Sequence, residues 1–235
     1  MRSARRTLFA MSYTLAMSRR ALVAARRERS AEAVRRTAVE WADTLCERLG
    51  VRVRAEGIDA VDWDRPLVVM SNHQSLIDVP VIVSGLGRAF GFLAKKELFR
   101  VPFFGRAMTG LGCVCIDRGD ATSAHRSIAA AGAQVRAGSS IIVFPEGTRG
   151  PGGRLLPLKK GPFYLVQAAS VPIVPLGLSG TGRVLSRNGL LIYPGEVRLR
   201  VGAPLACAGD SAEAREELRA RTREALLALA GLGEG

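Results

Sequence analysis

The 235-residue chain has 48% hydrophobic residues and 26 glycines, which excludes an intrinsically disordered protein and allows one sizeable domain with a full core. Its formal net charge of +13 favours an acidic partner such as a nucleic acid, an anionic membrane, or a phosphorylated or acidic substrate carrier. The cysteines form neither a C-x-x-C motif nor a metal-ligand spacing, so we expect the reduced thiols of a cytosolic protein. They are Cys46, Cys113, Cys115 and Cys207.

Residues 1–49 differ in composition from the rest of the chain. They contain eleven arginines and no lysine, and no acidic side chain precedes Glu28. The uncharged stretch between Arg6 and Arg19 is too short to span a membrane, which takes about 20 residues. A first helix would carry an apolar stripe flanked by arginines, and a second helix is expected over about 31–48. The stripe residues are Leu8, Met11, Leu15 and Leu22.

We interpret residues 1–49 as a basic amphipathic helical pair that lies in the interface of an anionic membrane. Two alternatives remain open. The first helix would either be an ordinary amphipathic helix packed on the domain, or belong to a cleaved signal or transit segment.

The main body, residues 50–235, is expected to form one α/β domain. Apolar runs predict strands at 51–54, 67–71, 90–94, 113–116, 140–144 and 173–178, and a late β-pair at 190–193 and 197–201. Periodic apolar positions predict helices at 79–86, 102–108, 120–138 and 162–169, and a last helix from its cap at Asp210 to Gly231. Residues 150–160 are predicted to form a mobile loop.

Strands that alternate with helices predict an open, mostly parallel or mixed sheet with helices on both faces, preceded by the N-terminal helical pair. On the strand at 113–116, Cys113 and Cys115 should share a face and are expected to be small core residues. His125 lies in the middle of a predicted helix without a partner motif, so we expect it on the solvent side.

One loop carries a pattern typical of acid–base chemistry. The apolar run at 67–70 ends in polar residues, as a buried strand that enters a loop does. Asp78 lies five residues after His73, and a continuous helix would place the two side chains about 140° apart. Because Pro80 is tolerated only in the first turn of a helix, the helix should begin near 77–79. The Asp78 carboxylate can then turn back to one ring nitrogen of His73. That contact leaves the other ring nitrogen free as a base. The alternative is a capping box between Ser75 and Asp78, with His73 a surface loop residue.

Polar side chains directly follow four of the predicted strands. Ligands of open α/β sheets bind at the carboxyl ends of the strands, so these side chains are expected to line one crevice. Each of them alone would be an ordinary solvated charge, whereas the set favours a site. The residues are His73, Lys95, Arg118, Glu146 and Arg149.

Four blocks of sequence, in this order, resemble the glycerolipid acyltransferase family, whose best-known members are the 1-acylglycerol-3-phosphate acyltransferases. Residues 72–78 (Asn-His-Gln-Ser-Leu-Ile-Asp) are similar to the N-H-x-x-x-x-D signature of that family, and residues 112–118 (Gly-Cys-Val-Cys-Ile-Asp-Arg) to its second block. Residues 144–149 (Phe-Pro-Glu-Gly-Thr-Arg) resemble the third block, and residues 171–175 (Val-Pro-Ile-Val-Pro) the fourth. The resemblance covers roughly 50–205.

The resemblance implies direct transfer of a fatty acyl group from acyl-CoA or acyl carrier protein to the free hydroxyl of a lysophospholipid, by default 1-acylglycerol 3-phosphate. His73, oriented by Asp78, would take the proton of the hydroxyl, and no metal, cofactor or acyl-enzyme is expected. The arginines would bind the acceptor's phosphate, while Glu146 would orient Arg149 or bind a hydroxyl. The residues assigned to the acceptor site are Lys95, Arg118, Glu146, Gly147, Thr148 and Arg149. Similar bacterial enzymes rest on the membrane through an N-terminal helical pair, which implies a peripheral or monotopic protein on the cytoplasmic face.

Other classes of function lack their motifs in this chain. No zinc-finger spacing, RNP-like aromatic pattern or basic zipper accompanies the positive charge, and aromatic residues make up only 6%, so no nucleic-acid partner is expected. Neither a phosphate-binding P-loop nor a G-x-S-x-G nucleophile elbow occurs. Intact His73 and Asp78 argue against a non-catalytic lipid-binding relative. Lyso-ornithine lipid and glycerol 3-phosphate remain alternative acceptors.

Overall fold

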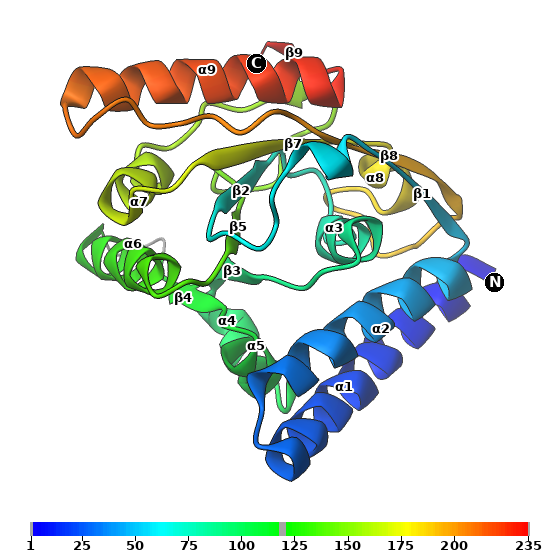
Figure 1. Ribbon diagram of the computed structural model, residues 1–235. Coiled ribbons are helices and arrows are strands. Elements are labelled where there is room, and N and C mark those ends of the chain that lie inside the picture. Colours follow the sequence, from blue (N-terminus) through cyan, green and yellow to red (C-terminus); the bar gives the residue numbers. More distant parts are fainter. Residues whose placement is uncertain (1, 118–120, 235) are drawn as a thin grey trace.

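The computed structural model describes residues 2–117 and 121–234. The sequence forms a layered α/β domain with two long helices at its N-terminal end (Figure 1). The helices are α1 (Arg2–Glu28), α2 (Ala31–Leu49), α3 (Asp78–Leu86), α4 (Lys96–Phe99), α5 (Phe104–Gly110), α6 (Ala121–Arg136), α7 (Gly161–Ala169), α8 (Thr181–Val184) and α9 (Ala212–Ala230), with a 3-10 turn at Ile58–Ala60. The strands are β1 (Val51–Glu56), β2 (Val68–Ser71), β3 (Gly91–Lys95), β4 (Val114–Ile116), β5 (Ile141–Val143), β6 (Arg154–Leu155), β7 (Ile173–Ser179), β8 (Gly195–Val201) and β9 (Gly233–Glu234).

The main sheet has the strand order β1-β8-β7-β2-β5-β3-β4. Its neighbours pair in parallel, except that β7 and β8 are antiparallel. The predicted fold class, an open and mostly parallel mixed sheet behind an N-terminal helical pair, is therefore confirmed. The carboxyl ends of β2, β5, β3, β4 and β7 meet along one edge of the sheet, because these strands all run the same way.

Helices cover both faces of the sheet (Figure 1). Successive side chains of β2 point to opposite faces: Val69 packs in the core cluster that includes Val81 of α3 and Leu49 of α2, whereas Val68 packs with Phe163 of α7. The second face also carries α6 and α9, since Ile128 and Leu218 belong to the same cluster as Val68. The central strands are thus buried on both sides, which explains their continuous apolar runs.

The N-terminal helices form an antiparallel pair joined by a short turn (Figure 1). Ser30 caps α2 by accepting the N–H of Glu32, and Gly50 ends that helix in the left-handed region. The inner face of α1 packs onto α2 and the domain through buried Met17 and Ala21. Its outer face leaves three residues of the predicted stripe in solvent, since Leu8, Met11 and Leu15 are 69%, 65% and 40% exposed, whereas Leu22 is partly buried. No helix among residues 2–117 and 121–234 combines the length and apolar character needed to cross a bilayer.

The first strand of the predicted late β-pair is wrong, whereas the second, at 197–201, is present within β8. Residues 190–193 form no strand, and Tyr193 instead donates its main-chain N–H to the carbonyl of Val184. Both edges of β8 are already occupied, by β1 and by β7, so no edge remains for a further partner.

The prediction of a mobile loop at 150–160 is also wrong. β6 pairs with β9 near the chain end, and Leu155 is fully buried. Arg219 and Arg223 of α9 donate to the carbonyls of Leu158 and Leu156. The glycine and proline content therefore shapes a fixed path rather than a free segment.

Three smaller expectations change. Cys113 is buried in a cluster with Ala94 and Met108, but Cys115 is exposed on β4, the edge strand. The cap of α9 is Ser211, whose hydroxyl accepts the N–H of Ala214, and not Asp210. The predicted start of α6 at Asp120 lies outside the described residues. His125 is exposed, as predicted.

Candidate active site

The loop between β2 and α3 brings His73 and Asp78 together. The helix begins at Asp78, with Pro80 in its first turn, as the proline predicts. His73 Nδ1 lies 2.7 Å from Asp78 Oδ2, which is hydrogen-bond distance. The Asp78 side chain is fully buried and that of His73 is 16% exposed. A buried carboxylate thus holds one ring nitrogen of a histidine that still reaches solvent.

The same carboxylate oxygen also organises the loop backbone. Asp78 Oδ2 accepts the main-chain N–H of Gln74 at 2.8 Å and that of Ser75 at 2.9 Å. The bond from Ser75 is half of the capping box that was the alternative interpretation, so the cap and the histidine contact coexist. The Ser75 hydroxyl turns away and donates to the carbonyl of Leu185 at 2.6 Å. Among the described residues Asp78 Oδ1 has no hydrogen-bond partner.

Glu146, at the end of β5, holds the His73 loop from the other side. Its Oε1 accepts the main-chain N–H of His73 at 2.7 Å, and its Oε2 accepts that of Leu156 at 2.9 Å. Burial raises the pKa of Glu146, against the lowering effect of these two N–H donors. Both oxygens are occupied by backbone donors, so the expectation that Glu146 orients Arg149 is replaced by a contact with the histidine loop.

Two further residues fix the position of the histidine, and neither was singled out from the sequence. The His73 ring stacks on Phe144, with centroids 4.1 Å apart. Asn72 is fully buried and bonds Leu178 of β7 in both directions, Nδ2 to the carbonyl at 2.9 Å and the N–H to Oδ1 at 2.7 Å. The available signal was their place in the sequence. Asn72 directly precedes His73, and Phe144 lies two residues before Glu146, each at the end of an apolar strand.

The other predicted site residues are less closely joined. Lys95 and Thr148 are exposed, and Gly147 adopts a positive φ of 72° in the turn after β5. Arg149 Nη1 donates to the carbonyl of Arg187 at 2.7 Å, so its guanidinium reaches the loop after α8. Arg118 lies outside the described residues. The structure therefore brings His73, Asp78 and Glu146 into one network, with Arg149 beside it.

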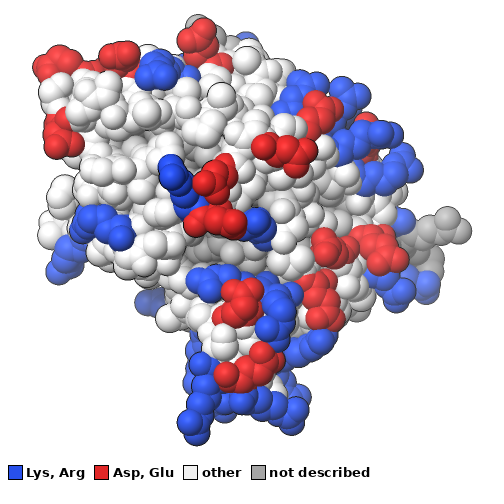
Figure 2. All heavy atoms as spheres, in the orientation of Figure 1, with Lys and Arg blue, Asp and Glu red and all other residues white. Residues whose placement is uncertain are grey.

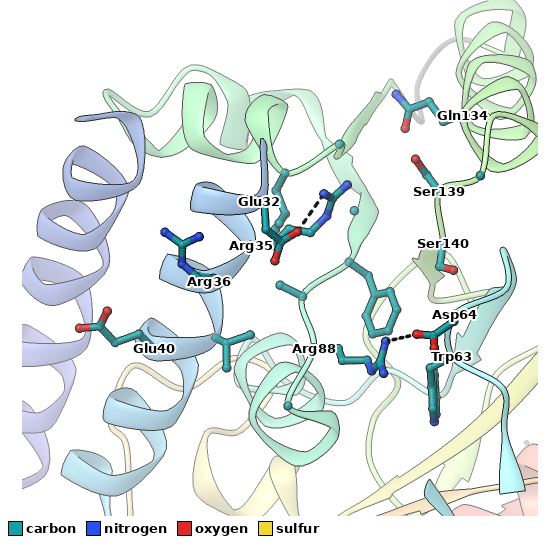
Figure 3. Close-up of a pocket in the computed structure, with 18 of the residues that line it drawn as sticks. Glu32, Arg35, Arg36, Glu40, Trp63, Asp64, Arg88, Gln134, Ser139 and Ser140 are labelled. Atoms are coloured by element: carbon teal, nitrogen blue, oxygen red, sulfur yellow. Dashed lines mark hydrogen bonds and ion pairs between the residues drawn. The ribbon is translucent and has the colours of Figure 1, made fainter. Parts of the chain in front are cut away.

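A cavity larger than any space beside the His73 loop described below lies at the opposite edge of the sheet. It has a volume of about 840 Å³ and is lined by residues that precede β2, β3 and β5, together with α2. Figure 3 shows two pairs among the lining residues, Arg88 with Asp64 and, along α2, Arg35 with Glu32. None of the predicted site residues lines it. Its size therefore does not make it the candidate site.

Known proteins share both the sequence and the fold of this chain. The Acyltransferase family model matches residues 52–179, which is more than half of the chain and includes the His73–Asp78 loop and the Glu146 turn. The chain belongs to the Acyltransferase family. This confirms the relationship expected from the four sequence blocks.

Named relatives include 1-acyl-sn-glycerol-3-phosphate acyltransferases. The chloroplastic enzyme BAT2 of Brassica napus is 38% identical over 144 residues, 60% of this chain and 41% of that protein. The enzyme of Pseudomonas aeruginosa is 30% identical over 173 residues, 73% of this chain and 66% of that protein. The chain thus spans less than two thirds of the length of the curated relatives that it matches. The crystal structure of the 1-acyl-sn-glycerophosphate acyltransferase PlsC from Thermotoga maritima aligns over 100% of this chain and 98% of that one, with a TM-score of 0.81 and 26% identity.

Proposed function

We propose that this acyltransferase moves a fatty acyl group from the thioester of acyl-CoA or acyl carrier protein to the free hydroxyl of a lysophospholipid. The preferred acceptor is 1-acylglycerol 3-phosphate, which gives phosphatidic acid. The names of the relatives support this substrate class. The observation that carries the proposal is the 2.7 Å contact between His73 and the buried Asp78 at the carboxyl end of β2.

In the proposed mechanism the Asp78 carboxylate accepts a hydrogen bond from the Nδ1–H of His73. The other ring nitrogen, Nε2, then carries the lone pair. Nε2 takes the proton of the acceptor hydroxyl while the oxygen attacks the thioester carbonyl. A carbon–oxygen bond forms, the carbon–sulfur bond breaks, and the departing sulfur receives the proton from the imidazolium. The products are an ester and a free thiol, and no protein nucleophile is consumed.

Arg149 and Arg118 are proposed to bind the phosphate of the acceptor. The position of Arg149 supports its part, because the next residue, Gly150, donates its main-chain N–H to the carbonyl of His73, and among the described residues only Nη1 of the Arg149 guanidinium has an acceptor. A planar guanidinium offers further donors to a phosphate. In the proposed site Thr148, Gly147 and Lys95 shape the entrance, and Glu146 positions the histidine loop rather than touching the phosphate.

The outer face of α1 is proposed to lie in an anionic membrane surface, with the protein peripheral on the cytoplasmic side. Its exposed stripe extends onto the loop after α8, because Thr7 Oγ1 donates to the carbonyl of Leu190 at 2.6 Å. Leu190 is 80% exposed and Leu191 44% exposed. We call Leu8, Met11, Leu15, Leu190 and Leu191 the apolar patch. Apolar side chains at this density insert into an acyl boundary.

Basic residues gather farther along the helical pair than the apolar patch. Figure 2 shows Lys and Arg side chains gathered over the end of the helical pair where α1 turns into α2, with a few acidic ones among them. The arginines at this end include Arg26, Arg27, Arg35 and Arg36. Each basic residue held close to an anionic surface contributes about 1 kcal/mol of attraction.

Acyl-transfer assays test the proposal. Purified protein is incubated with a radiolabelled acyl donor, as acyl-CoA and as acyl carrier protein, and with 1-acylglycerol 3-phosphate, lyso-ornithine lipid or glycerol 3-phosphate. Of the three acceptors, 1-acylglycerol 3-phosphate should give the highest kcat/KM, with the label recovered in phosphatidic acid. Transfer to another acceptor alone would reassign the substrate, and no transfer to any acceptor from either donor would overturn the proposed activity.

A further inference from the structure

A second cleft, of about 420 Å³, opens beside the His73 loop. Its walls come from Gln74, the turn at 150–153, the start of α8, and the C-terminal end of α9. Gly150 joins the cleft to the site, because its main-chain N–H donates to the carbonyl of His73 at 2.7 Å. Unlike the larger cavity at the opposite sheet edge, this cleft is lined by Gln74, the residue that follows the proposed base.

Gln74 gives the cleft an unpartnered polar group. The residue is 8% exposed and its main-chain N–H is bonded to Asp78, yet its side-chain amide makes no hydrogen bond to any residue within 2–117 or 121–234. The amide nitrogen and oxygen are not among the fully shielded unpaired atoms of the described residues, so this amide borders the open cleft rather than the closed core. The amide is thus available to a ligand, one residue away from His73.

The walls of the cleft suit a slender ligand. Glycines supply much of the lining, so main-chain atoms rather than side chains face the cavity. At Gly182 a Cβ atom would lie 3.7 Å from Gln74 Oε1, which is ordinary contact and shows how a single side chain would fill the space between them. Main-chain N–H and C=O groups at such walls pair well with the amides of a ligand.

The rim of the cleft is basic. Arg183 and Arg187 line it and are exposed, and none of the described lining residues is acidic. The carbonyl of Arg187 accepts a hydrogen bond from Arg149. The backbone that carries the Arg187 side chain is therefore joined to a residue of the candidate site. Two guanidinium groups at the outer end favour a phosphate there.

We infer that this cleft binds the 4′-phosphopantetheine arm of the acyl donor, an inference that rests on the proposed acyl transfer. The thioester end would lie at His73, the amides of the arm would meet Gln74 and the glycine backbone, and the phosphate would meet Arg183 and Arg187. Coenzyme A and acyl carrier protein share this arm, so one cleft serves either donor.

The cleft lies between the end of α9 and the loop that carries part of the apolar patch. One wall is the end of α9, which covers the face of the sheet opposite to α2 and α3. The apolar patch lies on α1 and the 190–191 loop, and α1 packs on α2. The rim residue Arg187 lies three positions before Leu190 of this patch and its carbonyl accepts from Arg149, so the inferred donor arm and a membrane-borne lysolipid would meet at neighbouring positions beside the His73 loop.

Steady-state kinetics of two variants test the inference. Gly182→Leu fills the cleft at a position without positive φ, and Arg183→Ala removes the charge at its rim. Arg221→Ala is the matched control, since Arg221 is exposed on α9 and does not line the cleft. The donors are acyl-CoA, acyl carrier protein and acyl-pantetheine, which lacks the phosphate, and circular dichroism checks the fold of each variant.

Gly182→Leu should raise KM about 10-fold or more for all three donors and leave the KM of the lysolipid within about twofold, because a filled cleft removes binding of the arm alone. Arg183→Ala should raise KM about 10-fold for the two phosphorylated donors but not for acyl-pantetheine, since each charge-assisted bond to phosphate is worth about that factor. An equal rise in KM for acyl-CoA and acyl carrier protein identifies the arm that they share. A rise in KM for only one of them would show that the cleft recognises the part of that donor outside the arm, and would overturn the inference.

Two further results would overturn the inference. In Gly182→Leu, a higher KM for the lysolipid with an unchanged KM for the donors would assign the cleft to the acceptor. If this variant is folded and the KM of neither substrate changes, the cleft binds neither of them. Both are distinct from failure of the proposed function, in which the unmodified protein would transfer no acyl group from any of the donors.

Discussion

The main-chain N–H of His73 donates to Glu146 Oε1 at 2.7 Å, although the two residues are 73 positions apart in the chain. This bond joins the loop after β2 to the turn after β5, and the neighbouring contact from Asp78 fixes the imidazole ring itself. The histidine is thereby held at both its backbone and its side chain. Such double support keeps a base in one orientation before a substrate binds.

His73→Ala should reduce kcat of acyl transfer about 10²–10⁴-fold, which is the range for loss of a general base. Asp78→Asn should reduce it nearly as much, because an amide next to Nδ1 permits the wrong tautomer. Initial rates with saturating donor and acceptor provide the measurement, with His125→Ala as the control. His125 is exposed on α6, so its variant should retain the rate of the unmodified protein. A His73→Ala protein with more than a few per cent of that rate would rule out the base assignment.

Glu146→Gln should lower both stability and activity. The amide keeps one acceptor oxygen but directs an NH₂ group at a main-chain N–H of His73 or Leu156, and an unpaired buried group costs about 1–3 kcal/mol. Urea unfolding should show that loss, and kcat should fall because the His73 loop shifts. Exposed Glu97 on α4 offers a matched control, Glu97→Gln, with neither effect expected. Full activity in Glu146→Gln would show that the histidine loop holds its position without this carboxylate.

Arg149→Ala should chiefly raise KM for a phosphorylated acceptor and change kcat little. An arginine that binds an unreacting phosphate contributes equally to the ground state and the transition state. Arg118→Ala should behave in the same way. KM and kcat for 1-acylglycerol 3-phosphate are to be compared with those for an acceptor without phosphate, whose KM should not change. A collapse of kcat at constant KM would mean that the arginines act on the charge that develops during transfer.

The double variant Leu8→Ser, Leu190→Ser should weaken binding to anionic vesicles by about 10-fold or more, since each inserted leucine contributes about 1.5–3 kcal/mol. These side chains are exposed, so the fold should survive, whereas deleting residues 1–27 would also remove the packing of Met17 and Ala21. Activity on a short-chain soluble acceptor should be unchanged. Vesicle flotation at low and high salt is the measurement, because screening over about 8–10 Å weakens the arginine contribution.

Tyr164→Ser on α7 is the control for the vesicle experiment. Tyr164 is 43% exposed, and α7 covers the face of the sheet opposite to α2 and α3. Its variant should bind vesicles as the unmodified protein does. If the double variant also binds vesicles normally, the apolar patch is not the membrane contact.

The cysteines should divide into two reactive and two protected thiols. Burial raises the pKa of Cys113 to about 12 and that of Cys46 to about 11, so both stay protonated at pH 8 and react slowly, because the thiolate is the nucleophile. Cys115 is exposed and Cys207 partly exposed, so a maleimide should modify these first. Intact mass spectrometry should show two additions in the native protein and four in denaturant. Rapid native labelling of Cys113 would contradict its burial.

The sign of the raised thiol pKa also gives a stability prediction. The unfolded thiols ionise near pH 9, and the folded ones only near 11 to 12. The folded state therefore holds more protons in this window, so the free energy of unfolding should fall as pH rises through it. Denaturant unfolding of Cys113→Ala should show a shallower decline between pH 9 and 11 than that of the unmodified protein.

Local sequence was sufficient for the features that depend on neighbouring residues. The apolar run at 67–70 predicted β2, and Pro80 predicted where α3 begins, because a proline restricts its own backbone and that of the residue before it. These two facts place Asp78 at the start of the helix and within reach of His73. The contact at 2.7 Å was therefore predictable from fifteen residues of sequence, 66–80.

Only the tertiary structure decided which distant segments meet. The place of β2 between β7 and β5 puts Glu146 beside His73 and Leu178 beside Asn72, and no local pattern encodes a strand order. The same order occupies both edges of β8, which is why the apolar run at 190–193 forms a loop with exposed leucines instead of a strand. Local pattern reports how a segment can be buried, whereas its partner is chosen by competition among all surfaces of the folded chain. The unpaired amide of Gln74 also depends on distant segments. The residues that α8 and the turn after β5 place near it are largely glycines, which have no side chain to pair with the amide.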